Sequence, residues 1–437
     1  MRERRLLLEL LFRAGIAAVE PAALVARRVR RVGKQLAVEG APASWGGPTV
    51  VVGAGKASAR MAAAVAGVIG RDLAGGLVVA PRGPREEIPG IAVRSGGHPL
   101  PSDEGEQSTR ALIWLLQERP EAAVVALISG GASSLLIRPI PPLVLADLIA
   151  TNEALLASGA RIHEINTVRK HLDNVKGGGL IRIARGRPFV TLILSDVIGD
   201  DPVTIGSGPT CADPTTFADA VDVVERYQLR RSLPPAVIRL LEAGTRGELP
   251  ETLKPGAEEL AGVVNLVIGS NRDALEAAAV AARRAGYEPV IADEPLVGDT
   301  MEAAQKFAGW VLRRGEVANR PLCLLAGGET TVRLGASPGR GGRNQEFGLA
   351  CARAFDGRSI NLLSAGTDGV DGPTDAAGAW VDGSTLERAR RLGLDAAAAL
   401  AGHDSYAFFD ALGDLFRPGP TGTNVMDIKI ALIGKPS

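Results

Sequence analysis

The fold is decided by the stretch Val50-Val51-Val52-Gly53-Ala54-Gly55-Lys56-Ala57-Ser58, which leads into an alanine-rich run. Three β-branched apolar residues in succession are typical of a short strand that is buried on both faces. The glycines permit a tight turn out of that strand, and the alanine-rich run predicts a helix. A strand that passes directly into a helix is the unit from which parallel α/β sheets are built.

Similar apolar runs recur along the chain and alternate with helical stretches. They predict strands at residues 77–80, 123–128, 189–194, 264–268, 288–292, 322–326 and 360–364. This alternation predicts an α/β fold with mostly parallel sheets flanked by helices. Before the first strand, two helices are expected over about 2–19 and 22–37, with Pro21 at the start of the second.

The length of 437 residues predicts two domains, because a single hydrophobic core rarely grows beyond roughly 250–300 residues. Composition changes around residues 245–260, where glycine, proline and glutamate are frequent and periodicity is weak. We therefore predict an N-terminal Rossmann-like α/β domain, opened by a helical segment, over residues 1–255. A C-terminal α/β domain is predicted over residues 256–437.

Composition argues against several classes of protein. The 49 basic residues balance 49 acidic ones, so the electrostatic case for nucleic-acid binding is absent. No uncharged apolar run approaches the roughly 18–20 residues that a membrane span needs. The apolar start of the chain is interrupted by Glu9 and Arg13, which favours a helix over a signal peptide. Three separated cysteines and four scattered histidines predict a reducing, cytoplasmic setting without a zinc site.

Lys56 lies in the turn that follows the first strand. In open α/β sheets, ligands bind beyond the carboxyl ends of the strands, where helix N-termini attract anions. Gly53 and Gly55 let a ligand approach the backbone closely, and Lys56 adds a mobile positive charge. The loop is not a Walker A motif, whose first glycine would fall on Val50. Taken alone, it fits an anion site and a plain turn with a solvated lysine equally well.

Two further clusters in the first half suit an anionic ligand. Ser129-Gly130-Gly131-Ala132-Ser133-Ser134 follows a predicted strand and offers backbone N–H groups and hydroxyls for a phosphate; a serine-capped helix start is the alternative. Asn166, Arg169 and Lys170 precede a triple glycine at 177–179. The cations there fit either an anion site or a solvated helix face.

Acidic side chains follow the strand predicted at 189–194. Asp196, Asp200 and Asp201 lie just beyond its end. Mg²⁺ is usually bound through one or two carboxylates together with substrate phosphates, so these residues are candidate ligands. Capping of a local helix by one of them is the alternative.

The second half carries its own strand-end clusters. Glu329 lies in a Gly-Gly-Glu-Thr segment, and Arg343 lies among the glycines of the 339–346 segment. The planar fork of arginine binds a carboxylate or a phosphate through two parallel hydrogen bonds. Asp368 belongs to the acidic, glycine-rich segment 366–375, which lacks the closing glutamate of an EF-hand.

The clusters occur in a similar order in both halves of the chain. Gly-Ala-Gly (53–55), Ser-Gly-Gly-Ala-Ser-Ser (129–134) and Ser-Asp-Val-Ile-Gly-Asp-Asp (195–201) are echoed by clusters at 267–271, 326–331 and 366–372. Internal duplication and convergent strand-end chemistry both explain the echo. Different strand orders in the two halves would exclude duplication.

Cations for anionic groups, carboxylates for Mg²⁺ and glycine-rich nests for phosphates together describe phosphoryl transfer. That chemistry depends on positioning and charge neutralisation more than on a covalent nucleophile. The serines are not accompanied by a histidine pattern, so a hydrolase triad has no support.

Taken in order, these motifs resemble those of the glycerate 2-kinase family, whose C-terminal part is a MOFRL-type domain. The resemblance covers nearly the whole chain from about residue 50. It is carried by the segments 53–57, 96–101, 129–133, 165–172, 195–202, 341–346, 366–374 and 421–427. Two departures are mild: Gly206 stands where alanine is expected, and Ser102 displaces an acidic residue by one place.

The resemblance implies a kinase that transfers the γ-phosphoryl group of ATP to the 2-hydroxyl of D-glycerate, giving 2-phosphoglycerate. It also implies an active-site cleft between the two domains, with Lys56 and Arg343 tied to the substrate. Our hypothesis for the roles gives Arg343 the glycerate carboxylate and Lys56 the reacting hydroxyl, and makes Asp196 a metal ligand or proton acceptor. Substrate contacts would come from Lys56, Asn166, Arg169, Lys170 and Arg343. Nucleotide contacts would come from Gly53, Gly55, Ser129, Gly130, Gly131, Ser133 and Glu329. Mg²⁺ contacts would come from Asp196, Asp200 and Asp368.

Two alternative functions remain open from the sequence. An NAD(P)H-dependent hydroxypyruvate reductase is favoured weakly by a strand followed by Gly-x-Gly. Against it, no acidic residue stands at the end of a second strand, because Asp72 lies where a helix ends. A non-catalytic protein that binds small acids or nucleotides is the other alternative. Small-molecule partners, a cytoplasmic location and a monomer or homodimer are expected.

Overall fold

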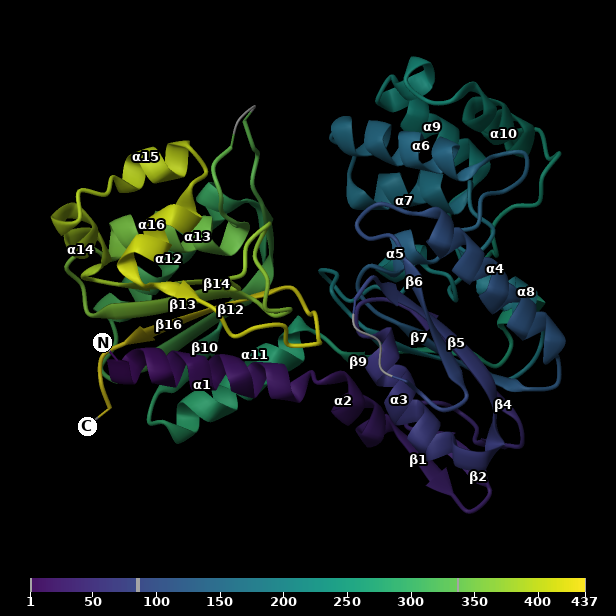
Figure 1. Ribbon diagram of the computed structural model, residues 1–437, viewed down its shortest axis with the longest axis horizontal. Coiled ribbons are helices and arrows are strands. Elements are labelled where there is room, and N and C mark those ends of the chain that lie inside the picture. Colours follow the sequence, from purple (N-terminus) through teal and green to yellow (C-terminus); the bar gives the residue numbers. More distant parts are fainter. Residues whose placement is uncertain (1, 84–86, 336–337, 437) are drawn as a thin grey trace. The chain divides into compact units, whose positions relative to one another are not determined.

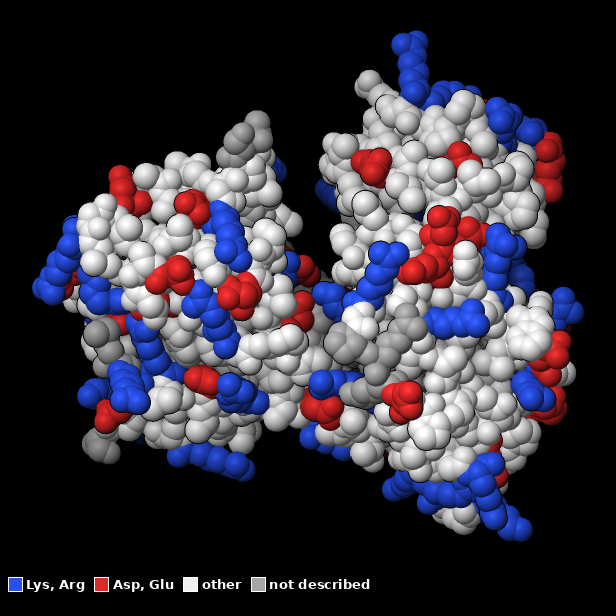
Figure 2. Space-filling model, viewed as in Figure 1, with Lys and Arg blue, Asp and Glu red and all other residues white. Residues whose placement is uncertain are grey.

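The computed structural model describes residues 2–83, 87–335 and 338–436, and it divides into two compact units. The central unit comprises Pro21–Ile268. The terminal unit comprises Met1–Glu20 together with Gly269–Ser437. Within the described ranges, none of the helices combines the length and apolar character that crossing a bilayer requires. On the face shown in Figure 2, basic and acidic side chains are interspersed, in line with the net charge of zero.

The central unit is built on a six-stranded sheet. Its strands are β4 (Thr49–Ala54), β5 (Leu73–Pro81), β6 (Ile91–Gly96), β7 (Ala123–Ile128), β8 (Phe189–Leu194) and β9 (Val263–Gly269). Their order is β6-β5-β4-β7-β8-β9, and the pairs β4/β5, β5/β6, β4/β7 and β7/β8 are parallel. The chain therefore moves outward from β4 in one direction and from β7 in the other. This reversal is the topological switch point at which open α/β sheets bind ligands.

Helices surround this sheet (Figure 1). Some of them form a second hydrophobic core. The helices are α2 (Pro21–Arg28), α3 (Ser58–Ile69), α4 (Asp103–Glu118), α5 (Ala132–Leu135), α6 (Leu145–Ala157), α7 (Ile162–Lys170), α8 (Gly179–Ala184), α9 (Phe217–Arg226) and α10 (Pro235–Thr245). Single 3-10 turns occur at Gly70–Asp72, Ile205–Ser207, Leu229–Arg231 and Glu258–Leu260. The sheet core includes apolar residues of β4, β7, α4 and α8, whereas α6, α7, α9 and α10 pack around Phe217.

The N-terminal part of the central unit differs from the prediction. The second helix ends at Arg28, and the chain continues as an antiparallel sheet of β1 (Val29–Val32), β2 (Gln35–Val38) and β3 (Trp45–Gly46). Val32 pairs with Gln35, and Gly33, at a φ of +61°, opens the two-residue turn between them. The predicted helix over 22–37 was wrong in its second half, because a glycine that supplies a positive φ favours a hairpin.

The terminal unit is built on a seven-stranded mixed sheet. Its strands are β10 (Glu288–Ile291), β11 (Leu296–Asp299), β12 (Leu322–Thr331), β13 (Ile360–Gly366), β14 (Gly378–Asp382), β15 (Leu415–Phe416) and β16 (Asp427–Ile433). Their order is β10-β12-β16-β13-β14-β15, and β11 pairs with β12 beyond β10. β10 and β11 run parallel to β12, whereas β16 runs antiparallel to both β12 and β13, and β14 antiparallel to β13 and β15.

Helices cover both faces of this second sheet (Figure 1). α1 (Arg2–Ala18) and α11 (Asn271–Arg284) pack together on one face, and α12 (Thr300–Glu316) and α13 (Arg343–Phe355) pack together on the other. The remaining helices are α14 (Thr385–Arg391), α15 (Ala396–Ala401) and α16 (Ser405–Leu412). Phe307, Phe347 and Phe355 lie in the core beneath α12 and α13.

The predicted α/β class is confirmed, and each of the eight predicted strands is present. Three details differ. The second sheet is mixed, because runs of buried apolar residues do not encode strand direction. β9, which falls within the C-terminal domain predicted over residues 256–437, is the edge strand of the central sheet, and α1, which falls within the predicted N-terminal domain, joins the terminal unit. The strand orders of the two sheets differ, which excludes internal duplication as the source of the echo between the halves.

Candidate functional site

The loops after β4 and β7 lie side by side at the switch point of the central sheet. The amide of Lys56 donates to the carbonyl of Gly130 at 2.8 Å, and the amide of Ala57 donates to Ser129 Oγ at 3.0 Å. Gly55 has a φ of +133°, and a Cβ there would lie 2.1 Å from Ser129 Oγ. Only glycine fits, so the two loops close on each other directly. The structure thus brings together the two predicted anion-binding loops, and the Lys56 side chain is exposed.

Buried hydroxyls connect the second loop to helix α7. Ser133 Oγ lies 2.8 Å from Ser207 Oγ, which donates to Asn166 Oδ1 at 3.1 Å. Asn166 and Ser207 are both buried. Asn166 therefore holds the Ser207 turn against α5, which carries Ser133, and its polar side chain is used within the protein.

Arg169 and Lys170 are neighbours in sequence but differ in their surroundings. Lys170 is buried, and its ammonium group lies 3.4 Å from the buried carboxylate of Asp213. Arg169 donates to Asn152 Oδ1 at 2.6 Å, and it has no carboxylate partner in the part of the chain that the structure describes. Burial lowers the pKa of its guanidinium. Arg169 and Ser133 line one small cavity of about 10 Å³, which holds about one water molecule.

The acidic residues after β8 lie at the same edge of the central sheet. Asp201 accepts from the Val203 amide at 3.1 Å and from Thr204 Oγ1 at 2.8 Å, so it caps the local turn. Asp196 and Asp200 are half-buried, and Asp200 has a φ of +54°. Among the described residues no group of three or more potential ligands is close enough to hold a metal alone. Two carboxylates fit a Mg²⁺ ion that takes its other ligands from phosphates and water.

In the terminal unit, Asp427 begins the central strand β16. It is in register with Gly328 of β12 and with Gly366 of β13. Because β12 and β13 both run antiparallel to β16, their carboxyl ends meet at the edge where Asp427 lies. Glu329 and Asp368 follow those two glycines, so the register collects the predicted acidic clusters at one edge of the sheet. Asp368 itself accepts from the Val370 amide at 3.1 Å.

Arg343 opens helix α13 at the same edge. Its Nε and Nη2 donate to the two carboxylate oxygens of Asp427 at 2.8 and 3.0 Å, and its Nη1 lies 2.7 Å from Glu329 Oε1. Burial opposes the charged form of Arg343, but Asp427 and Glu329 outweigh it and raise the pKa of the guanidinium. Burial also opposes ionisation of Asp427, but Lys429 and Arg343 lower the pKa of that carboxyl overall. The fork predicted to bind glycerate is thus occupied by two carboxylates of the protein.

Asp371 fixes the start of α13. One carboxylate oxygen accepts from the amide and the Nδ2 of Asn344 at 3.0 and 3.2 Å, and the other accepts from the amide and the Nε2 of Gln345 at 2.9 and 3.0 Å. A Cβ at Gly342 would lie 2.3 Å from Asp371 Cγ, so glycine precedes the helix. Lys429 contacts Asn344 Oδ1 and lies 3.5 Å from Asp427 Oδ2. These buried contacts hold Arg343 in place.

The raised pKa of the Asp371 carboxyl predicts that the stability of the protein depends on pH. Burial raises its pKa to about 6, and the charge of Asp427 adds to this, although the amides of Asn344 and Gln345 oppose it. A carboxyl whose pKa is raised in the folded state contributes stability below pH 4, which is lost as the pH rises through 6. About two pKa units correspond to about 3 kcal/mol. As the pH rises from 4 to 7, the unfolding free energy of the wild type should therefore fall relative to that of Asp371→Asn. Urea unfolding across that range tests this, and parallel profiles would contradict it.

Comparison with known proteins adds to this geometry. Two family models match: a domain of unknown function, DUF4147, over residues 7–242, and the MOFRL family over residues 322–427. A protein of Agrobacterium vitis named "Putative hydroxypyruvate reductase" is 44% identical over 98% of this chain and 94% of its own. A protein of Pyrococcus horikoshii named glycerate 2-kinase is 39% identical over 96% of this chain and 94% of its own.

A solved structure resembles the whole chain. The crystal structure of a glycerate kinase from Thermotoga maritima superposes with a TM-score of 0.86 at 34% identity, covering 99% of this chain and all of that one. The fold, the strand-end loops and these full-length relatives define an α/β protein with a DUF4147 part followed by a MOFRL part. The chain belongs to the glycerate 2-kinase family.

The residues that the sequence interpretation missed are Asp371, Asp427 and Lys429. Asp427 ends the Thr-Gly-Thr-Asn-Val-Met-Asp segment, and Asp371 lies in the glycine-rich segment 366–375, so both were near recognised motifs. No strand was predicted at 427–433; with one, an acid at its start and a lysine two residues later would have indicated that both side chains point to one face. No pattern in the sequence indicated that Arg343 would pair with Asp427.

Proposed function

We propose that this protein is an ATP-dependent glycerate 2-kinase that phosphorylates D-glycerate at its 2-hydroxyl. One observation carries the proposal. The Lys56 loop and the Ser129–Gly131 loop close on each other at the switch point of a parallel sheet, in a chain whose full-length relatives include a glycerate 2-kinase. Glycine-rich turns at such a point present backbone N–H groups to phosphate.

In the central unit we assign the phosphoryl-transfer groups to residues at this edge. Lys56 would neutralise charge on the transferred phosphoryl group, because it is the exposed cation of the paired loops. Gly53, Gly55, Ser129, Gly130, Gly131 and Ser133 shape the phosphate-binding turns. Arg169, half-buried and without a carboxylate partner among the residues that the structure describes, supplies a second positive charge beside Ser133. Asn166 and Lys170 support this edge of the sheet through their buried contacts with Ser207 and Asp213, respectively.

Asp196 and Asp200 are the residues that would hold Mg²⁺ together with phosphate oxygens. When bound, the ion neutralises charge on the phosphates. The contribution of the chain is to place two half-buried carboxylates after β8, the parallel neighbour of the strand that precedes the Ser129–Gly131 loop. The 2-hydroxyl must lose its proton as the phosphoryl group arrives, and Asp196 is the residue we assign to accept it. Asp368 belongs to the terminal unit, and its assignment to the metal remains a prediction.

In the terminal unit we propose that Arg343 binds the glycerate carboxylate by exchanging partners. Asp427 is buried and holds the fork at two points, whereas Glu329 is 43% exposed and lies 2.7 Å from Nη1. The substrate carboxylate would replace Glu329 at Nη1 while Asp427 stays bound. Arg343 and Lys56 belong to different units, and we propose that both serve the same reaction.

Glu329→Gln tests this exchange. Removing the competing carboxylate should lower KM for glycerate about two- to five-fold with little change in kcat, because an exposed ion pair contributes at most about 1 kcal/mol. Glu316→Gln, at the exposed end of α12, is the matched control and should change neither constant. If Glu329 instead binds the nucleotide, KM for ATP will rise and KM for glycerate will stay constant.

The position of phosphorylation is tested by coupling the reaction to enolase without phosphoglycerate mutase. Phosphoenolpyruvate should form directly, because enolase accepts 2-phosphoglycerate. A strict requirement for the mutase would show that the 3-hydroxyl is phosphorylated instead.

A reductase is the second candidate, favoured by the name of the Agrobacterium vitis relative. The geometry weighs against it. A dinucleotide-binding sheet places an acidic residue at the end of the strand after the glycine loop, and β5 ends at Pro81, followed by Arg82. Arg82 donates to Glu104 at 2.9 Å. Loss of NADH with hydroxypyruvate, without ADP formation from glycerate and ATP, would replace the kinase proposal with the reductase.

A further inference from the structure

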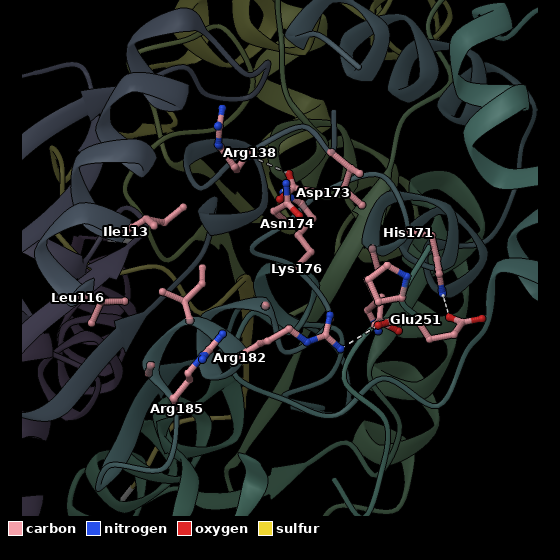
Figure 3. A pocket seen from close by; sticks show the side chains of 18 of the residues that line it. Ile113, Leu116, Arg138, His171, Asp173, Asn174, Lys176, Arg182, Arg185 and Glu251 are labelled. Atoms are coloured by element: carbon pink, nitrogen blue, oxygen red, sulfur yellow. Dashed lines mark hydrogen bonds and ion pairs between the residues drawn. The ribbon is translucent and has the colours of Figure 1, made fainter. Parts of the chain in front are cut away.

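The central unit contains a cavity of about 630 Å³ whose lining is mostly outside the residues assigned to the proposed reaction (Figure 3). Its walls come from α4, α8, the end of α7 and the segment 249–252. Neither Lys56 nor Asp196 lines it, and neither does the Ser129–Gly131 loop. Its volume falls within the roughly 300–1,000 Å³ that small-molecule sites occupy.

The lining carries an excess of positive charge. Six lysines and arginines line the cavity, against the acids Asp173 and Glu251. Three of the six cations pair with carboxylates of the same unit, namely Arg138, Lys170 and Lys176, and Arg187 donates to three backbone carbonyls. The other two, Arg182 and Arg185, have no carboxylate partner within the described ranges.

Arg182 belongs to α8, and Arg185 follows the last residue of that helix at a φ of +44°. Arg182 Nη2 donates to the backbone carbonyl of Glu251 at 2.8 Å, which holds its guanidinium at the cavity wall. Both arginines are exposed residues that line the same cavity. Two arginine forks without a carboxylate partner suit an anionic group, which they can bind through parallel hydrogen bonds.

The opposite part of the lining is apolar. Ile113 and Leu116 of α4 lie along one side of the cavity in Figure 3, and Ile183 of α8 also lines it. Ile113 and Ile183 are partly exposed, so a ligand can still cover apolar surface there. Burial of apolar surface beside an ionic contact favours a ligand that has both characters over a simple inorganic anion.

We propose that this cavity is a second binding site, for an organic anion whose phosphate, sulfonate or carboxylate group is joined to an apolar or aromatic body. Arg182 and Arg185 bind the anionic group, and Ile113 and Ile183 contact the body. Of the residues assigned above to phosphoryl transfer, Lys170 lines this cavity and pairs there with Asp213, whereas Lys56, Arg169, Asp196 and Asp200 do not line it. The site does not depend on the substrate of the enzyme being glycerate.

Anilinonaphthalene sulfonate is a probe of this chemistry, because it joins a sulfonate to an aromatic body and fluoresces when it leaves water. Titration of the full-length protein should give one saturable site, and Arg182→Ala/Arg185→Ala should weaken it about ten-fold or more. Arg230→Ala/Arg246→Ala is the matched control. It removes the same charge from exposed ion pairs of the same unit, and dye binding should not change.

A second variant keeps both arginines. Ile183→Glu places a carboxylate beside them and should weaken the dye as strongly. The steady-state constants for glycerate and ATP should match the wild type in both cavity variants. Equal dye affinity in wild type and cavity variants would overturn the proposal, because the dye then binds elsewhere. A parallel loss of kcat/KM would overturn it too, because the cavity would then belong to the catalytic site.

Discussion

Lys56→Ala is expected to lower kcat about 100-fold or more while leaving KM for glycerate nearly unchanged. A preorganised charge aimed at the transferred phosphoryl group stabilises the transition state more than the bound substrates, and its loss appears in kcat. The amide of Lys56 is tied to Gly130 and its side chain is exposed, so the melting temperature should stay close to that of the wild type. Steady-state kinetics with both substrates, together with a melting curve, provides the measurement.

Lys34→Ala is the control for this prediction. Lys34 is an exposed lysine in the turn between β1 and β2, and its removal takes the same charge from the same unit. Its kinetics should equal those of the wild type. A change confined to KM in Lys56→Ala would assign Lys56 to ground-state binding. Full kcat in that variant would remove Lys56 from the mechanism.

Asp427→Ala is expected to destabilise the terminal unit by about 3–5 kcal/mol, because removing one partner of a buried ion pair leaves uncompensated charge. Asp427 is almost completely buried, as is Lys429, and Arg343 is two-thirds buried. Lys429 would lose its carboxylate neighbour, and Arg343 would lose the acid that it contacts through two nitrogens while keeping Glu329. Urea unfolding followed by the fluorescence of Trp310 and Trp380, which belong to this unit, should show an earlier transition.

Asp410→Ala is the matched control, because Asp410 pairs with Arg417 at the surface of the same unit and is 53% exposed. Its cost should stay below about 1 kcal/mol. Asp427→Ala/Lys429→Met should recover part of the stability lost in the single variant, since it also removes the buried charge of Lys429, whereas Arg343 keeps Glu329. Equal destabilisation by the Asp427 and Asp410 variants would contradict the buried pair as the cause.

Much of the fold could be predicted because its signals are local. The runs Val50–Val52, Ala123–Ile128 and Phe189–Leu194 are apolar throughout, and strands buried on both faces need such runs. The hairpin of β1 and β2 escaped prediction, since Val29–Val32 continues the polarity pattern of the preceding helix. The boundary between the units differs from the predicted one, because composition does not show which sheet an apolar strand joins. β9 belongs to the central sheet.

The candidate site could likewise be predicted from the sequence only in part. Lys56, Ser129 and Asp196 follow predicted strands, and the carboxyl ends of parallel neighbours lie at one edge, so their proximity could be expected. The partners of Arg343 could not. Asp427 is 84 residues away in sequence, and it reaches Arg343 only because β16 is inserted between β12 and β13.

The sequence by itself determined the α/β class, the glycine turns and the residues that carry charge at the strand ends. These depend on apolar periodicity and on the backbone freedom of glycine, which are properties of short segments. Only the tertiary structure decided which charges meet. The register of β16 places Asp427 opposite Gly328 and Gly366, and a shift of one residue would turn its side chain to the other face of the sheet. The loop that carries Lys56 was therefore readable from the sequence, whereas the pairing of Arg343 with Asp427 follows from long-range hydrogen-bond register.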